Sequence, residues 1–352
     1  AQFNEEYSDN AKALFESLAE HADFKDRVYF VINDSVKREH LNSRYPNKFI
    51  SSSNFKDALF ILRARYWFCS ALELPLATFL QRHRRQVIHL GHGMLVKKIG
   101  LIETKVSWYK KLYYALVNSS FTYTIATTPF CQKDIATGFG VPLNRVLLTP
   151  QPKTSQIAFP IQIENKTLAN QELIHVLYAP TWRPYAAVEL FPFADFELNE
   201  FASFLVENTI HIWLRVHPRF EQDIDPALLA CDNIHLFSAK EYSEVNSYLS
   251  YFDALITDYS SIYYDYLTLE RPVLFFDYDF EKYNDVVGVI DDYEQVKSTE
   301  TTVSADQFNQ QLLSIKGGSY DLTRIREINK LANYPVANKD IAKVVLEKLK
   351  LN

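Results

Sequence analysis

The fold is decided by residues 255–276, where LITDYSSIYYDY (residues 255–266) is closely followed by ERPVLFF (residues 270–276). An apolar run ends at Thr257 and Asp258, and the whole segment predicts a strand, a polar turn, a helix and a second strand. Ser260 and Ser261 fall where a helix N-cap and first turn expose unpaired backbone N–H groups. Helix N-termini attract anions, and ligands of open α/β sheets gather at the carboxyl ends of strands. The turn is therefore a candidate phosphate or diphosphate site, and an ordinary serine cap is the alternative interpretation.

Asp265 extends this candidate site along the expected helix. It lies on the helix that the two serines open, seven residues before Pro272. Its carboxylate could reach a ligand lying over that helix, and a ribose is the group we expect there.

Strand-like apolar runs recur along the chain and are separated by segments of helix length. This alternation is typical of a parallel, doubly wound sheet, and it occurs in both halves. The runs are residues 28–32, 66–69, 87–90 and 123–126, then 174–178, 210–214, 234–237, 254–256 and 273–276. We therefore expect an α/β protein with two Rossmann-like domains, joined by a linker and followed by C-terminal helices. The expected boundaries are 1–155, 156–171 for the linker, 172–322, and 323–352 for the helices.

Composition restricts the class of protein. The chain has 352 residues, of which 47% are hydrophobic, and this is enough for the cores of two domains. The formal net charge of −6 argues against nucleic acid as a partner, because proteins that bind it usually carry a basic excess. The three cysteines are widely spaced and suit reduced thiols, and no run approaches the roughly 18–20 apolar residues of a membrane span. We expect a cytoplasmic location.

His92 stands between two glycines just after a strand-like run. Its ring should project from a tight turn at the carboxyl end of that strand. Histidine, with an ordinary pKa of about 6.5, can accept a hydroxyl proton at neutral pH, an assistance worth about 10²- to 10⁴-fold in rate. We expect His92 to be a general base, and a hydrogen bond within its own loop is the alternative. His89 and His92 lack a third ligand at suitable spacing, so no metal site is expected.

Arg215 and His217 alternate on an expected strand that ends at Pro218, so both side chains should point to one face of the sheet. A fixed guanidinium and an imidazole directed at one point suit the charge of a diphosphate. A salt bridge at the strand end is the alternative. Arg183 is either a third cation near the ligand or a solvated charge.

Residues 101–116 combine basic and aromatic side chains. Trp108, Leu112 and Ala115 recur at helical spacing, and lysines lie toward the other faces of the expected helix. Such a helix could lie on anionic lipid or hold a polyanionic acceptor. The alternative is a solvated helix that packs its apolar stripe on the domain core.

Five motifs, in this order along the chain, resemble those of the CDP-glycerol glycerophosphotransferase family, the bacterial teichoic-acid and capsule polymerases. They are Tyr7-Ser8-Asp9-Asn10, His92-Gly93 with Lys97, Tyr178-Ala179-Pro180-Thr181-Trp182-Arg183, Arg215-Val216-His217-Pro218 and the segment 255–276. The chain also departs from the family pattern. Gly91 replaces an aromatic residue, Met94-Leu95 replaces Thr-Pro, and Pro152-Lys153-Thr154-Ser155 stands where the family has Pro-Arg-Asn-Asp.

The resemblance implies a GT-B fold, in which an N-terminal acceptor-side domain and a C-terminal CDP-polyol-binding domain face each other across a cleft. The implied reaction transfers glycerol phosphate from CDP-glycerol to a hydroxyl of a growing teichoic acid or capsule polymer and releases CMP. The implied partners are CDP-glycerol or CDP-ribitol, a polyanionic glycan or lipid-linked acceptor, and the inner face of the membrane, without nucleic acid. The motifs require no cofactor and leave a need for Mg²⁺ open.

The resemblance also implies roles for individual residues. In the catalytic group, His92 takes the proton of the acceptor hydroxyl, and Arg215 and His217 meet the charge of the phosphates and of the departing CMP. The expected donor-binding residues are Thr257, Asp258, Ser260, Ser261, Asp265 and Arg183. The expected acceptor-side residues are Lys97, Asp9 and Asn10.

Three other hypotheses stay open at this point. A ribitolphosphotransferase would use CDP-ribitol on the same scaffold. A GT-B glycosyltransferase would move a sugar from a nucleotide sugar without its phosphate. An inactive scaffold of an assembly complex would release no CMP from any CDP-polyol.

Overall fold

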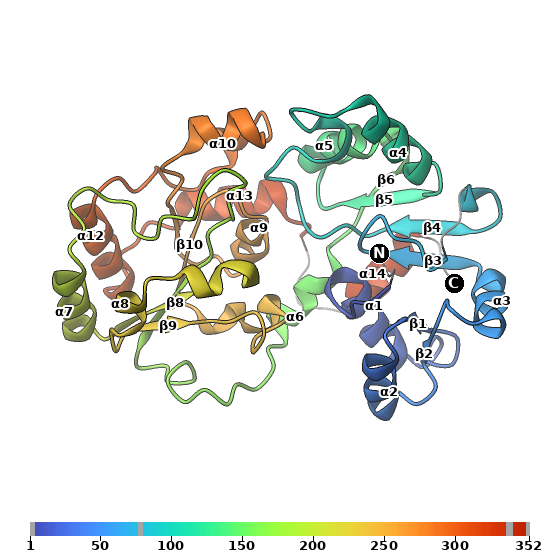
Figure 1. The fold of residues 1–352 in the computed structure, drawn as a ribbon, viewed down its shortest axis with the longest axis horizontal. Helices are drawn as coiled ribbons and strands as arrows, with labels where there is room; N and C mark the ends of the chain where they lie inside the picture. The colour runs from blue at the N-terminus through green and yellow to red at the C-terminus, as the bar shows by residue number, and fades with distance from the viewer. Residues whose placement is uncertain (1–3, 77–79, 336–340, 350–352) are drawn as a thin grey trace. The chain divides into compact units, whose positions relative to one another are not determined.

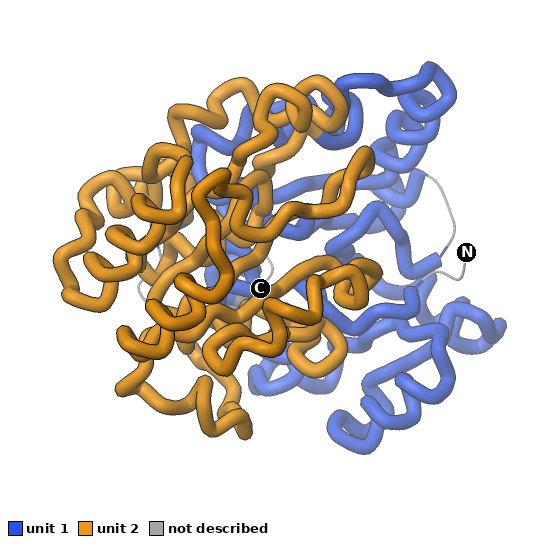
Figure 2. Tube along the Cα trace, turned by 60° about the vertical axis from the view of Figure 1, so that its left-hand side comes forward, with its two compact units in different colours: residues 1–94, 99–155, 334–352 blue, residues 95–98, 156–333 orange. Residues whose placement is uncertain are grey.

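The computed structural model describes residues 4–76, 80–335 and 341–349, and the chain divides into two compact α/β units (Figure 1). Figure 2 colours unit 1, residues 1–94, 99–155 and 334–352, and unit 2, residues 95–98 and 156–333. Every strand pairing within the sheets of both units is parallel. The expected α/β class with two Rossmann-like units is confirmed.

Unit 1 contains a four-stranded sheet of order β3-β4-β5-β6 and a separate pair, β1-β2. The strands are β1 (Phe30–Val31), β2 (Phe49–Ile50), β3 (Tyr66–Cys69), β4 (Gln86–His89), β5 (Tyr123–Ala126) and β6 (Val146–Leu148). The helices are α1 (Asp9–Glu20), α2 (Ser35–Arg44), α3 (Phe55–Arg63), α4 (Trp108–Asn118), α5 (Pro129–Phe139) and α14 (Ile341–Lys348). The run at 28–32 thus yields only a two-residue strand, while β2 and β6 were not expected because short strands lack a clear period.

Local signals explain where several of these helices begin and end. The side chains of Asp34 and Asn54 accept hydrogen bonds from the first turns of α2 and α3, as N-caps do. α5 begins with Pro129 and ends before Gly140, whose φ of 61° is left-handed. Proline suits the first helical turn and glycine the left-handed position after the last.

The C-terminal segment contributes to both units. α13 (Thr323–Ala332) belongs to unit 2, whereas α14 belongs to unit 1. Val345 and Leu346 of α14 are buried in the cluster that also contains Leu14 and Leu18 of α1. The expected tail at 323–352 is therefore divided between the units, and its residues 336–340 and 350–352 lie outside the described part of the chain.

Unit 2 is built on a five-stranded sheet of order β11-β10-β7-β8-β9. The strands are β7 (Ile174–Tyr178), β8 (Ile210–Leu214), β9 (Ile234–Leu236), β10 (Ala254–Thr257) and β11 (Val273–Phe275). The chain runs outward from β7 to β9 on one side, then crosses back and continues with β10 and β11 on the other. The order reverses between β7 and β10, and ligands of doubly wound sheets bind at the carboxyl ends of strands at such a switch point.

The helices of unit 2 lie before, between and after these strands, and the expected linker is part of this unit. They are α6 (Ser155–Ala158), whose first residue is counted with unit 1, α7 (Leu198–Asn208), α8 (Pro226–Leu229), α9 (Ile262–Leu267), α10 (Phe280–Val286), α11 (Tyr293–Val296), α12 (Ala305–Lys316) and α13. A large core joins the inner faces of β7, β8 and β10 to α7 and α12, including Phe201, Leu205, Phe308 and Leu312. Residues 156–171 group with unit 2 instead of standing apart.

Candidate functional site

His92 lies on the turn that follows β4 in unit 1. Gly91 and Gly93 on either side have φ of 65° and 132°, conformations that favour glycine. The imidazole is 63% exposed, so the ring projects from the carboxyl end of the strand into solvent, as the sequence predicts.

The imidazole is held by a carboxylate from the start of α1. His92 Nδ1 is hydrogen-bonded to Asp9 Oδ2, and Lys153 Nζ lies 3.9 Å from Asp9 Oδ1. Burial raises the pKa of Asp9, but the hydrogen bond to His92 and the charge of Lys153 outweigh it, so the net pKa is lower than usual. The carboxylate is therefore ionised at neutral pH.

Asn10 and Lys153 fix the backbone of the same turn. The Asn10 amide donates hydrogen bonds to the carbonyls of Leu90, at 3.1 Å, and Gly91, at 2.9 Å. The ammonium of Lys153 donates to the carbonyl of His92 at 2.7 Å, and the Lys153 N–H donates to Asn10 Oδ1. Asn10 is fully buried, so its side chain holds the turn and is not exposed to an acceptor.

In unit 2 two of the sequence motifs meet at the switch point of the sheet. The chain leaves β7 into Ala179–Arg183 and leaves β10 into Asp258–Ser261, and β7 and β10 are neighbours. The two segments are tied together, because the N–H of Thr181 donates to Asp258 Oδ1 at 2.9 Å and the Thr257 hydroxyl donates to the Ala179 carbonyl at 2.9 Å.

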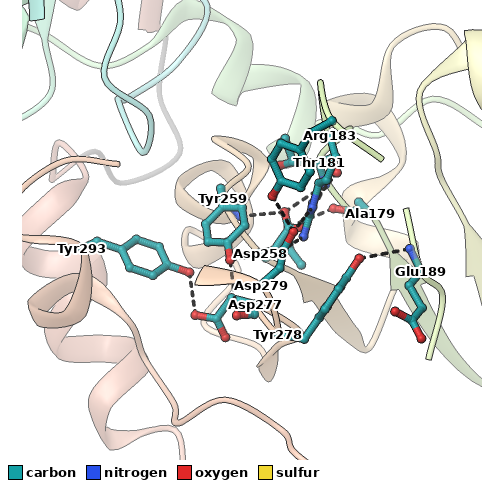
Figure 3. A network of polar contacts seen from close by, with 12 residues as sticks. Ala179, Thr181, Arg183, Glu189, Asp258, Tyr259, Asp277, Tyr278, Asp279 and Tyr293 are labelled. Atoms are coloured by element: carbon teal, nitrogen blue, oxygen red, sulfur yellow. Dashed lines mark hydrogen bonds and ion pairs between the residues drawn. The ribbon is translucent and has the colours of Figure 1, made fainter. Parts of the chain in front are cut away.

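Arg183 is the centre of a buried network of polar contacts (Figure 3). Its guanidinium donates to Asp258 Oδ2 at 2.6 Å and makes two hydrogen bonds to Asp279, at 3.0 and 2.8 Å. The hydroxyls of Tyr185 and Tyr259 also donate to Asp279. Burial opposes the charge of Arg183, but Asp258 and Asp279 raise its pKa above the ordinary value. The residue is only 3% exposed, so it is not a solvated charge, and its expected contact with the donor stays a prediction.

The remaining residues of the motif at 257–265 differ in accessibility. Thr257 and Asp258 are buried and engaged with unit 2 itself, and their expected contact with a donor stays a prediction. Ser260 and Ser261 are half-buried. Ser261 stands at the N-cap of α9 without a side-chain cap hydrogen bond, and Ser260 Oγ accepts the Ile262 N–H at 3.5 Å. Asp265 is 4% exposed. Its expected contact with a ribose stays a prediction.

Arg215 and His217 lie beyond the end of β8, which stops at Leu214, so their alternation on a strand is wrong. Arg215 is half-buried, and its guanidinium donates to the carbonyls of Phe237 and Tyr242, at 3.3 and 2.6 Å. Burial lowers its pKa. The exposed ring of His217 accepts a hydrogen bond from the Arg219 N–H through Nδ1. Arg215 forms no ion pair with any residue that the structure describes, so the strand-end salt bridge is absent there.

Lys97 lies in unit 2 and not with the acceptor-side residues. Residues 95–98 pair with the loop after α10: Lys97 forms an antiparallel bridge with Val289, and the Lys98 N–H donates to the Gly288 carbonyl at 3.0 Å. Burial lowers the pKa of Lys97, while the charge of Asp258 raises it and that of Arg183 lowers it. Lys97 is half-buried as a residue, and its ammonium makes no hydrogen bond or ion pair with the described part of the chain. Lys98, by contrast, pairs with the exposed Asp291 at 2.7 Å.

Three residues that contribute to the His92 turn and to the Arg183 network were not assigned a role from the sequence. Lys153 was singled out only as a departure from the family motif, and Asp279 follows a strand end with no signal of its own. Thr181 is buried next to the Arg183 network, beside the switch point where ligands of such sheets bind.

Within the described residues, no three His, Cys, Asp or Glu side chains are grouped so that they could hold a metal ion. None of the helices in the same ranges is both long and apolar enough to cross a bilayer.

The two parallel α/β units, with a histidine turn in one and a switch-point motif in the other, have the features of a GT-B-type transferase. The family model of CDP-Glycerol:Poly(glycerophosphate) glycerophosphotransferase matches residues 1–348. The chain therefore belongs to this family, and it is an enzyme of the glycerophosphotransferase class.

Individual relatives agree with this assignment. The chain is 26% identical to the teichoic acid glycerol-phosphate transferase of Staphylococcus aureus (strain NCTC 8325 / PS 47), over 82% of this chain and 76% of that protein. It is 26% identical to the teichoic acid glycerol-phosphate primase of Bacillus subtilis (strain 168), over 81% and 75%. The solved structure of the wall teichoic acid polymerase TagF, in an H444N variant with CDPG, superposes with a TM-score of 0.75 at 18% identity, over 99% of this chain and 86% of that one. This similarity shows the shared fold.

Proposed function

We propose that this protein transfers glycerol phosphate from CDP-glycerol to a hydroxyl group of a cell-surface polymer or its lipid-linked precursor. The observation that carries the proposal is the exposed ring of His92, hydrogen-bonded to Asp9, within a chain that matches the glycerophosphotransferase family over almost its whole length. A ring with one nitrogen held by a carboxylate and the rest open to solvent is suited to take a proton from an incoming hydroxyl.

The donor is proposed to bind at the switch point of unit 2. Ser260, Ser261 and Thr181 offer hydroxyls there, and the cations Lys97 and Arg215 have no ion pair with the described residues. A diphosphate would supply the missing negative charge, since charge-assisted hydrogen bonds are the strong ones. We propose that the Arg183 network holds the donor site in shape, because it joins the two loops that carry these hydroxyls.

The proposed reaction is one displacement at phosphorus. The acceptor hydroxyl gives its proton to His92 as its oxygen forms a bond to the β-phosphorus of CDP-glycerol. The bond from that phosphorus to the bridging oxygen breaks, and its electron pair leaves with CMP. The product is a phosphodiester, and His92 returns its proton to solvent. Arg215 and His217 would offset the charge that develops on the leaving phosphate.

The test measures products and turnover together. We expect CMP release from CDP-glycerol with a lipid-linked acceptor, an added glycerol phosphate in the product mass, and a loss of about 10²-fold or more in turnover for His92→Ala. Donor binding by His92→Ala should equal that of the parent. Transfer only from CDP-ribitol, transfer of a sugar without phosphate, or no CMP release with either CDP-polyol would each contradict the proposal and favour one of the three alternatives.

We also propose that α4 attaches the protein to the inner face of the membrane. Trp108 is 77% exposed, and Leu112, Ala115 and Leu116 are exposed with it. The idea that this stripe packs on the domain core is wrong, because the buried residues of α4 are Val117 and Asn118. An exposed apolar stripe beside lysines suits an anionic lipid surface.

Binding to vesicles that contain phosphatidylglycerol tests this attachment. Burying a leucine-sized side chain is worth about 1.5–3 kcal/mol, so Trp108→Ser with Leu112→Ser should weaken vesicle binding about 10-fold or more. The matched control is Val36→Ser on α2, which is 77% exposed in the same unit but stands alone. Equal vesicle binding by the parent and both variants would show that α4 does not attach the protein to the membrane.

A further inference from the structure

We infer that Asp9 is the positioning residue of His92, and that Lys153 keeps the Asp9 carboxylate ionised and in place. The inference rests on the proposed function, because it presupposes that His92 accepts the proton of the acceptor hydroxyl. It differs from the role expected from sequence, which made Asp9 a contact of the acceptor itself.

Both oxygens of the Asp9 carboxylate are already engaged within unit 1. Oδ2 is hydrogen-bonded to His92 Nδ1. Oδ1 accepts the N–H of Asn10 at 2.8 Å and faces the ammonium of Lys153 at 3.9 Å. The Asp9 side chain is 18% exposed, against 63% for His92. The carboxylate is thus placed behind the imidazole, and it is the ring that faces outward.

This contact selects one tautomer of the imidazole. An ionised carboxylate can only accept hydrogen bonds, so Nδ1 must carry the hydrogen. Nε2 then keeps its lone pair, which makes it the ring atom that can take up a proton. Once Nε2 is protonated, the carboxylate also stabilises the imidazolium, because opposite charges in contact favour the charged form.

Lys153 contributes through two atoms at once. Its side chain is only 10% exposed, and the same ammonium that faces Asp9 donates to the His92 carbonyl at 2.7 Å. A cation beside Asp9 keeps the carboxylate ionised despite its burial. The hydrogen bond to the carbonyl holds the backbone of the turn, so Lys153 fixes both partners of the contact.

The backbone of Asp9 departs from the ordinary form to reach this position. Its φ is 62°, in the left-handed region, whereas Ser8 before it is extended. Non-glycine residues in that region are uncommon and cost of order 1–3 kcal/mol, a strain found mostly at functional sites. The hydrogen bonds of Asn10 to the 90–91 carbonyls offset that cost, since they anchor the start of α1 to the turn.

The test compares Asp9→Asn with the parent and with His92→Ala. Asn keeps the shape but not the charge, so kcat should fall roughly 10- to 100-fold, as for other partners that orient functional histidines. The KM for the acceptor should stay unchanged. In the His92→Ala background, Asp9→Asn should cause no further loss.

Matched variants separate this role from a general loss of charge or stability. Lys153→Arg should keep most of the activity and Lys153→Gln should lose it. Glu6→Gln is the control, because that carboxylate is 73% exposed and pairs with the exposed Lys37 at 3.0 Å, away from the His92 turn in the sequence. Thermal unfolding of each variant checks that the fold is kept.

Several results would overturn the inference. A raised acceptor KM with unchanged kcat in Asp9→Asn would make Asp9 a substrate contact, and additive losses in the double variant would give it a role apart from His92. NMR of ¹⁵N-labelled imidazoles reads the tautomer without any substrate: the parent should show a protonated Nδ1 in His92, and a protonated Nε2 refutes the inference. An inactive parent with the expected Nδ1–H would instead refute the proposed function alone.

Discussion

Replacing Arg183 by methionine should destabilise unit 2 without acting directly on the donor. Methionine removes the charge and keeps much of the length, so Asp258 and Asp279 stay where they are without their cation. Arg183 makes one hydrogen bond to Asp258 and two to Asp279, and its guanidinium lies within 5.4 Å of the ring centroids of Tyr259, Tyr278 and Tyr283. The site therefore loses the centre of a buried network.

The expected magnitude follows from that burial. The side chains of Arg183 and Asp258 are 1% and 2% exposed. Breaking a buried ion pair by removing one partner costs about 3–5 kcal/mol, because an uncompensated charge is left behind. For a unit of this size each kcal/mol lowers the unfolding midpoint by about 2–4 °C, so the midpoint should fall by about 6–20 °C.

Calorimetry and urea titration provide the assay, and Arg324→Met is the matched control. Arg324 pairs with Glu327 at 3.1 Å on the surface of α13, with 48% of its side chain exposed. Such a pair is worth about 1 kcal/mol or less. If Arg183→Met unfolds like the parent while its affinity for CDP-glycerol collapses, the network is not structural and Arg183 is a ligand-binding cation after all.

Three further changes test other parts of the structure. Lys97→Gln should weaken CDP-glycerol binding about 10-fold or more, as loss of a charge-assisted contact does, while Lys98→Gln leaves the affinity unchanged. Equal affinities of the two variants in calorimetry would show that Lys97 does not bind the donor. Burial, and then the charge of His235, lowers the pKa of His211 to about 4. As the pH falls below about 6.5, the unfolded chain therefore takes up a proton at His211 before the folded chain does, and the urea midpoint should drop between about pH 6.5 and 4. The drop should be smaller in His211→Phe. An equal drop in that variant would show that His211 does not cause it. Gly100→Ala should destabilise unit 1 by about 1–3 kcal/mol and lower its unfolding midpoint, because the added Cβ would lie 2.2 Å from the backbone carbonyl oxygen of Gly138 in α5; a parent-like midpoint would contradict this.

The sequence by itself located most strands of the four-stranded and the five-stranded sheet. Residues 66–69, 123–126, 174–178 and 210–214 were predicted with the bounds that the structure has, because runs of apolar and β-branched residues between polar segments have few other uses. The position of His92 followed from local chemistry as well, since two flanking glycines and a preceding strand are all within a few residues of it.

Pairings between distant residues could not be read in this way. Asp9 and His92 are separated by 83 positions, and Arg183 and Asp279 by 96. The sequence alone does not indicate whether a carboxylate will contact water, a ligand or a buried guanidinium. Arg183 was therefore expected at the donor, although it is buried in a network of its own.

The assignment of Lys97 shows the same limit. Its place in the motif after His92 suggested the acceptor side, but residues 95–98 pair with the backbone beside Val289 and so belong to unit 2. Backbone pairing of this kind depends on free N–H and C=O groups that every residue carries, so it has no sequence signature. Local patterns thus determined which elements form and which residues can carry the chemistry. Only the tertiary structure decided which charges neutralise one another inside the protein and which stay available to a substrate, because that depends on burial and on distances across the fold.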